Sequence, residues 1–169
     1  MKTTIIKQSK IDKIDFDNLQ FGKHFSDHMF SVRFKNNLWE EPEIKPYGTL
    51  HLNPSTHVFH YGQAIFEGMK AYKNPKGQTL LFRPMENLKR LNRSADRLCM
   101  PKLDNSIFID GLKHLLTIDD KWIPNSDEKS LYIRPFMIAE SEFIRATPAT
   151  EFRFMIITSP TSRYYSGKT

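Results

Sequence analysis

The types and spacing of Arg90, Tyr132 and Arg134 are suited to holding a small anion. Tyr132 and Arg134 lie two residues apart in an apolar-rich stretch, Ser130 to Ala139, which predicts a strand. Side chains two apart point to the same side of a strand, so both would face one anion together. The arginine fork matches a carboxylate or phosphate with two bonds, and a tyrosine hydroxyl can orient the same group. The same pattern is also typical of an exposed polar sheet face without a ligand.

The second arginine, Arg90, lies on a predicted helix. A proline at position 84 suits the first helical turn, and Pro101 ends the helix. One face is apolar, formed by Met85, Leu88, Leu91, Ala95 and Leu98. Arg90 lies off this face, at the rim of whatever the helix packs against, where its side chain can lean over a neighbouring site. A charged side chain that simply faces water explains the same spacing.

Two aromatic residues, Tyr61 and Phe66, flank a turn near Gly62 and could form the apolar wall of a pocket. We expect a turn carrying Tyr61, then a short helix that ends at Gly68. Spacing alone favours core aromatics for both side chains. From these patterns, the sequence supports an α+β domain with a candidate site for a small anion.

The remaining elements predict a sheet with helices on one side. His28 to Phe34 alternates as a half-buried strand does, and Gly68 to Arg83 has the two extended halves and central turn of a β-hairpin. A second helix is expected after Ser106, and Phe152 to Thr158 is a nearly continuous apolar strand. The prolines around Tyr47 to Leu52 allow at most a short edge strand there.

This order of elements predicts an α+β fold, a twisted and mostly antiparallel sheet with two main helices packed on one side. We expect an N-terminal arm over residues 1–20, a small α+β domain over 21–158 and the start of an interdomain connector over 159–169.

The composition limits the class of protein. With 39% hydrophobic and 12% aromatic residues, 169 residues are enough for one folded domain. The net charge of +6 suits an anionic ligand, but the basic residues are scattered, so no nucleic-acid partner is expected. No apolar run approaches the ~20 residues of a membrane span, so no membrane partner is expected either.

The N-terminus has no export-signal pattern, and Cys99 is the single cysteine, so a cytoplasmic protein is expected. We expect Cys99 to be a small buried side chain. The sequence contains no metal-spaced cysteine and histidine set and no glycine-rich phosphate loop, so no metal site is expected.

Four segments together resemble the branched-chain amino acid aminotransferases, fold-type IV enzymes that depend on pyridoxal 5′-phosphate (PLP). The segments are FGKHFSDHM (21–29), HYGQAIFEGMKAY (60–72), LFRPMENLKRLNRSADRLCMP (81–101) and SLYIRP (130–135). The combination of FEGMKAY with FRPxxNxxRxxxSAxRL is far more specific than any short motif. The resemblance covers about residues 20–169.

The resemblance implies roles for particular residues. Arg90 matches the arginine that grips the PLP phosphate, and Tyr132 with Arg134 matches the pair that holds a substrate carboxylate. Phe21 and Phe66 match the apolar wall for a branched side chain. The full set of implied substrate-binding residues is Phe21, Tyr61, Phe66, Tyr132, Arg134 and Tyr164, the last on the loop that joins the two domains of the family.

The chain departs from the family pattern in lacking the catalytic lysine, which forms a Schiff base with PLP and lies in a second domain. Lys168 lacks the Gly-Asn-Tyr context of that lysine, and Lys70 belongs to the first domain. The chain is therefore predicted to be the N-terminal small domain, inactive by itself, with no catalytic residue of its own.

The implied reaction is transfer of an amino group between L-leucine, L-isoleucine or L-valine and 2-oxoglutarate. The implied partners are these amino acids and 2-oxo acids, the missing C-terminal domain and, for the full enzyme, a second copy in a homodimer. The alternatives are a D-amino acid aminotransferase, an aminodeoxychorismate lyase, or a stand-alone anion-binding module.

Overall fold

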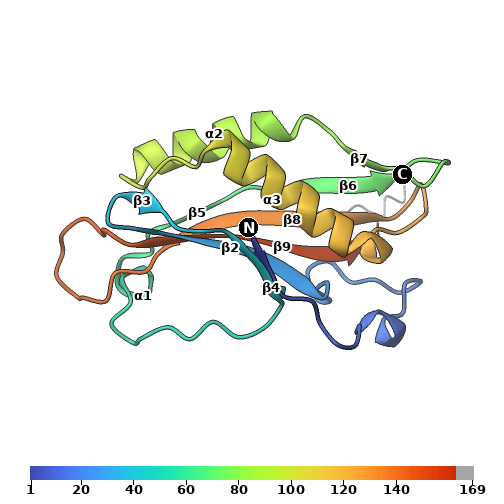
Figure 1. The fold of residues 1–169 in the computed structure, drawn as a ribbon, viewed down its shortest axis with the longest axis horizontal. Coiled ribbons are helices and arrows are strands. Elements are labelled where there is room, and N and C mark those ends of the chain that lie inside the picture. The colour runs from blue at the N-terminus through green and yellow to red at the C-terminus, as the bar shows by residue number, and fades with distance from the viewer. Residues whose placement is uncertain (163–169) are drawn as a thin grey trace, which may run out of the picture.

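A nine-stranded sheet forms the centre of the computed structural model, which describes residues 1–162 (Figure 1). The strand order is β1-β4-β2-β9-β8-β6-β7, with β3 paired to β2 and β5 paired to β8. The strands are β1 (Lys2–Thr3), β2 (His28–Lys35), β3 (Leu38–Trp39), β4 (Glu43–Pro46), β5 (Ala64–Phe66), β6 (Met69–Lys73), β7 (Thr79–Leu81), β8 (Ser130–Ala139) and β9 (Phe152–Thr161). β1 and β4 run parallel, and the other pairs are antiparallel.

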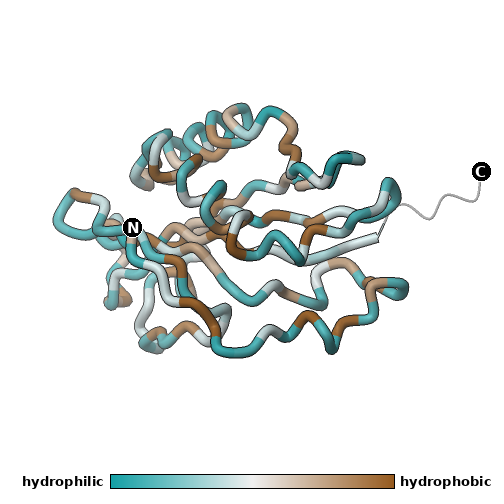
Figure 2. The backbone as a smooth tube through the Cα atoms, turned by 45° about the vertical axis from the view of Figure 1, so that its right-hand side comes forward, coloured by the Kyte–Doolittle hydropathy of each residue, from teal (hydrophilic) through white to brown (hydrophobic). Residues whose placement is uncertain are grey.

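Two helices, α2 (Pro84–Arg97) and α3 (Asn105–Ile118), lie over the same face of the sheet (Figure 1). Hydrophobic and hydrophilic residues are interleaved along them, as one buried face per helix requires (Figure 2). On α2 the predicted apolar stripe is buried at Leu88, Leu91 and Ala95. On α3, Gly111 lets the helix come so close to β2 that an added Cβ would overlap the Phe30 ring. The predicted α+β fold, with two main helices over a mostly antiparallel sheet, is confirmed.

Strand β8 separates the two faces of the sheet. Leu131, Ile133 and Met137 are fully buried. The even-numbered residues between them, including Tyr132 and Arg134, are partly exposed. Because alternate side chains leave a strand on opposite sides, the predicted anion-binding pair lies on the face turned away from the core.

The prediction for the segment around Gly62 was wrong in its order of elements. The helix comes first, as α1 (His57–Tyr61), and the extended strand β5 follows it. Gly62 has φ = 61°, so it ends α1 as a left-handed cap, a conformation that glycine adopts without steric cost.

One strand lies outside the segment considered for it, and another extends beyond its predicted limit. β4 comes before residues 47–52, where no strand forms; it lies between β1 and β2 in the sheet and buries Ile44 completely. β9 continues through Thr161, three residues into the expected connector, and those residues pair with the first three of β8. The domain limits themselves stay a prediction.

The expectation that Cys99 is buried was wrong. Cys99 is exposed and has φ = 53°, so it lies in the left-handed turn that follows α2.

The N-terminal arm is attached to the domain. Asp27 accepts hydrogen bonds from the Ser9 hydroxyl at 2.5 Å, the Lys10 amide at 2.9 Å and the Trp122 indole at 2.9 Å. Burial disfavours the charged form of Asp27, yet these donors outweigh it and lower the pKa of the carboxyl. No helix within residues 1–162 is long and apolar enough to cross a bilayer.

Candidate anion and substrate site

The site is built around Glu67 and Gly68, which interrupt the edge of the sheet between β5 and β6. Both strands pair with β8, and between them the Glu67 amide donates to the Pro135 carbonyl at 2.9 Å. Asn87 of α2 donates to the Gly68 carbonyl at 3.2 Å. This bond ties the interruption to the helix, so residues of α2 and of the sheet edge are held beside each other.

Arg90 is held by Glu67 through a two-bond ion pair. Its Nε lies 2.9 Å from Oε1 and its Nη2 lies 2.7 Å from Oε2. Asn87 also donates to Oε2 at 2.9 Å. The Arg90 side chain is 51% exposed and that of Glu67 only 11%. The carboxylate is thus the fixed member of the pair, and the Nη1 edge of the guanidinium makes no bond within residues 1–162.

The ion pair shifts the pKa of both Glu67 and Arg90. Burial opposes ionisation of Glu67, but the hydrogen bonds from Arg90 and Asn87 outweigh it and hold the pKa of the carboxyl below its usual value. The hydrogen bonds to Glu67 raise the pKa of Arg90 further above its usual high value, so the pair stays ionic.

Tyr132 and Arg134 interact directly on the outer face of β8. Nε and Nη2 of Arg134 donate to the Tyr132 hydroxyl at 3.0 and 2.7 Å. The Arg134 guanidinium lies 4.4 Å from the centre of the Phe66 ring, and the edge of Phe21 meets Tyr132 with ring centres 4.8 Å apart. Because Arg134 saturates the acceptor side of the hydroxyl, the Tyr132 proton is left to donate to an anion.

Gly68 determines where the Tyr132 hydroxyl can lie. A Cβ at position 68 would be 2.6 Å from that oxygen, nearer than real Cβ atoms approach. The φ of Gly68 is not in the left-handed region, so space rather than backbone conformation requires glycine here.

Arg90 and Tyr132 line one hollow of about 420 Å³, within the usual range for ligand sites. Lys70 and Asn87 add polar groups, and the wall is completed by Gly68, Met69, Tyr72 and Phe82. Two cations and a hydroxyl that line one hollow form a donor set suited to an anion such as phosphate or carboxylate, whereas Asn87 already donates its amide protons to Glu67 and Gly68.

The structure therefore brings together five of the residues predicted from the sequence: Phe21, Phe66, Arg90, Tyr132 and Arg134. Tyr61 lies elsewhere: its ring packs on His57 with centres 4.5 Å apart, and its hydroxyl donates to the Ile144 carbonyl at 2.5 Å. Its place in a substrate pocket stays a prediction. Tyr164 falls outside the described residues.

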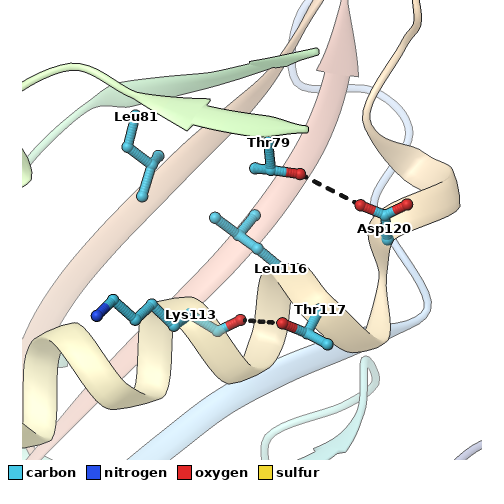
Figure 3. Close-up of a pocket in the computed structure, with 6 residues that line it drawn as sticks. All are labelled: Thr79, Leu81, Lys113, Leu116, Thr117 and Asp120. Atoms are coloured by element: carbon cyan, nitrogen blue, oxygen red, sulfur yellow. Dashed lines mark hydrogen bonds between the residues drawn. The ribbon is translucent and has the colours of Figure 1, made fainter. Parts of the chain in front are cut away.

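Another hollow, of about 430 Å³, lies between β7 and α3 (Figure 3). There Asp120 accepts from Thr79 at 3.2 Å and from Lys73, and Thr117 donates to the Lys113 carbonyl at 2.9 Å. None of the predicted site residues lines it, and most of its polar groups bond to each other. Within residues 1–162, no group of three or more His, Cys, Asp or Glu side chains could hold a metal ion.

Sequence reasoning missed several residues of the site, among them Glu67, Gly68, Lys70 and Asn87. Asn87 and Arg90 are three apart on a helix, so they share a face, and this signal was available. For Glu67 and Gly68, the available signal was an acidic residue followed by a glycine between two short extended stretches. The partner that this acid finds 23 residues later could not be read from the spacing.

Comparison with known proteins connects this geometry to a family. No family model matches the chain. Branched-chain-amino-acid transaminase 1 of Bacillus subtilis (strain 168) is 44% identical over 155 residues, which cover 91% of this chain and 44% of that protein. This chain is related to the branched-chain-amino-acid aminotransferases. The branched-chain-amino-acid aminotransferase of Mycolicibacterium smegmatis is 43% identical over 152 residues, 89% of this chain and 41% of its own length. The chain thus spans less than half the length of these curated relatives.

Solved branched-chain aminotransferases have the same fold. The T.th. enzyme with pyridoxamine 5′-phosphate matches with a TM-score of 0.57 at 23% identity, over 81% of this chain and 41% of its own. The enzyme of Thermoproteus uzoniensis with norvaline matches with a TM-score of 0.64 at 18% identity, over 82% and 43%. The mostly antiparallel sheet with its helices is therefore the fold-type IV architecture of these aminotransferases.

Proposed function

We propose that this chain supplies the phosphate- and carboxylate-binding part of a PLP-dependent branched-chain aminotransferase. The reaction is transfer of an amino group between L-leucine, L-isoleucine or L-valine and 2-oxoglutarate. The observation that carries the proposal is the shared hollow, in which Arg90 offers an unpaired guanidinium edge and Tyr132 an oriented hydroxyl. The family relationship supplies the reaction class.

The residues present fit PLP. Arg90 would hold the phosphate dianion, since its guanidinium is positively charged and its Nη1 edge makes no bond within residues 1–162. When bound, PLP supplies the electron sink for amino transfer. Tyr132, oriented by Arg134, would bind the substrate carboxylate, and Phe66, which is 63% exposed, would cover a branched aliphatic side chain together with Phe21. These groups bind and orient, and their apolar neighbours exclude water from the bound substrate.

The catalytic lysine would come from a C-terminal domain, as the family resemblance implies. The chain alone is therefore expected to be inactive, because surface lysines give no buried, positioned amine for PLP. Tyr61 and Tyr164 as substrate contacts, a homodimer for the full enzyme and a cytoplasmic location stay predictions.

The test compares the chain alone with a joined enzyme, in which the chain is continued by the part of the B. subtilis transaminase that it does not match. Glutamate formed from leucine and 2-oxoglutarate is measured for both. We expect glutamate from the joined enzyme only, with turnover lost in Arg90→Ala. Turnover by the chain alone, or a joined enzyme that binds PLP but accepts D-alanine instead of leucine, would contradict the proposal. Phosphate binding by the chain alone without PLP binding by the joined enzyme would favour the anion-binding module.

A further inference from the structure

The arginine proposed to hold a phosphate dianion already bonds to a carboxylate. Glu67 lies 2.7 Å from Nη2 of Arg90, so any anion bound at the neighbouring Nη1 edge is close to a like charge. By Coulomb's law alone, Glu67 weakens anion binding at this site. A residue that opposes the ligand electrostatically needs a compensating role in geometry.

The contacts of Glu67 indicate that role. Its carboxylate is almost covered, it accepts a further bond from Asn87 at 2.9 Å, and its own amide is bonded to the Pro135 carbonyl. It is therefore a fixed anchor at the sheet edge. The flexible member is Arg90, a long side chain that is half exposed on α2.

We propose that Glu67 is a positioning residue that fixes Arg90 by its Nε–Nη2 edge, so that the Nη1 edge stands ready for the phosphate. This inference rests on the proposed function, in which the anion is the phosphate of PLP. A free arginine loses rotamer freedom when it binds an anion, and an arginine already held by a carboxylate has lost that freedom beforehand. The gain in preorganisation must then exceed the repulsion from Glu67.

Glu67→Gln separates the two effects, with Glu86→Gln as the matched control. Glu86 is on the first turn of α2, and its charge also raises the pKa of Arg90, but it pairs with Lys89 at 2.8 Å instead of bonding to Arg90. Both variants remove one negative charge near Arg90. Charge removal alone strengthens phosphate binding in both, whereas loss of positioning weakens it in Glu67→Gln only.

The first measurement uses the chain itself and follows the Arg90 Nε–Hε signal by nitrogen-15 NMR. We expect a distinct, slowly exchanging signal in the parent and in Glu86→Gln, and an averaged, fast-exchanging one in Glu67→Gln. A Glu67→Gln signal that remains distinct and slow would overturn the inference.

The second measurement uses the joined enzyme and compares the dissociation constants of PLP and pyridoxal, which lacks the phosphate. The dissociation constant of pyridoxal divided by that of PLP isolates the contribution of the phosphate. This ratio does not depend on the folded fraction, because both ligands meet the same folded population. We expect Glu67→Gln to lower the ratio about tenfold and Glu86→Gln to leave it unchanged or raise it.

Arg90→Ala distinguishes the two proposals. If Arg90→Ala abolishes the advantage of PLP over pyridoxal while Glu67→Gln preserves or increases it, the positioning role is wrong and the proposed function stands. If Arg90→Ala leaves the ratio unchanged, the phosphate assignment fails and the inference about Glu67 fails with it.

Discussion

Replacing Gly68 by alanine tests whether the open space beside the Tyr132 hydroxyl is required. The added Cβ would lie 2.6 Å from Oη and 3.2 Å from Cζ and Cε2, whereas ordinary contacts begin near 3.4 Å. The hydroxyl must therefore retreat by about 0.8 Å. The two bonds from Arg134, at 3.0 and 2.7 Å, cannot both follow a shift of that size without a movement of Arg134.

The cost of this shift falls on binding more than on stability. Tyr132 is partly exposed and the clash is at the free end of its side chain, so we expect a loss of about 1 kcal/mol in the free energy of unfolding. In the joined enzyme a misplaced hydroxyl should raise KM for leucine about tenfold, the equivalent of one hydrogen bond to a charged group. PLP affinity should change less than this, because neither bond of the Arg90–Glu67 pair involves Tyr132.

Gly48→Ala is the matched control, since its new Cβ would meet only the Pro46 carbonyl oxygen, at 4.0 Å. Urea unfolding gives the stability of both variants, and the Arg134 Nε–Hε NMR signal reports the bond to Tyr132. If Gly68→Ala leaves that signal and KM as Gly48→Ala does, the requirement for space at position 68 is refuted.

Four further outcomes are expected. Gly111→Ala should lower the free energy of unfolding by about 1–3 kcal/mol in urea, despite the ~1 kcal/mol that alanine adds to a helix, because its Cβ would overlap a buried ring of β2. Leu91→Ala should cost about 2–5 kcal/mol in the same assay, since Leu91 is fully buried. The folded-state pKa of Glu67 lies below the unfolded value of 4.5, so the ionised carboxylate stabilises the fold above that pH, and this contribution is lost as the pH falls through the folded-state pKa. Between about pH 6 and pH 3, the free energy of unfolding of Glu67→Gln should therefore fall less steeply than that of the parent. The chain alone should bind a hydrophobic dye through exposed aromatics such as Phe21 and Phe66, and a monodisperse monomer without dye binding would count against an open pocket wall.

Strong periodicity made parts of the fold and site predictable. The stripe of α2 located Arg90 off the buried face, and the alternation of β8 put Tyr132 and Arg134 on one side of a strand, where they bond to each other. The turn near Gly62 indicated Phe66 and the family resemblance added Phe21; the contacts of both with this pair depend on tertiary structure.

The misses have physical reasons. β5 is three residues long, too short for a period to be recognised, and the left-handed φ of Gly62 depends on the chain beyond it. The ion pair between Glu67 and Arg90 joins residues 23 apart through the packing of a helix on a sheet edge. Spacing along the sequence carries no signal for such a contact.

The most direct test of the central claim is the crystal structure of the joined enzyme with PLP bound. The account predicts a phosphate oxygen within about 2.7–3.2 Å of Arg90 Nη1, with Nε and Nη2 still on Glu67 and Tyr132 on the wall of the same hollow. A phosphate held by other residues, with the Arg90 guanidinium turned to solvent, would contradict it.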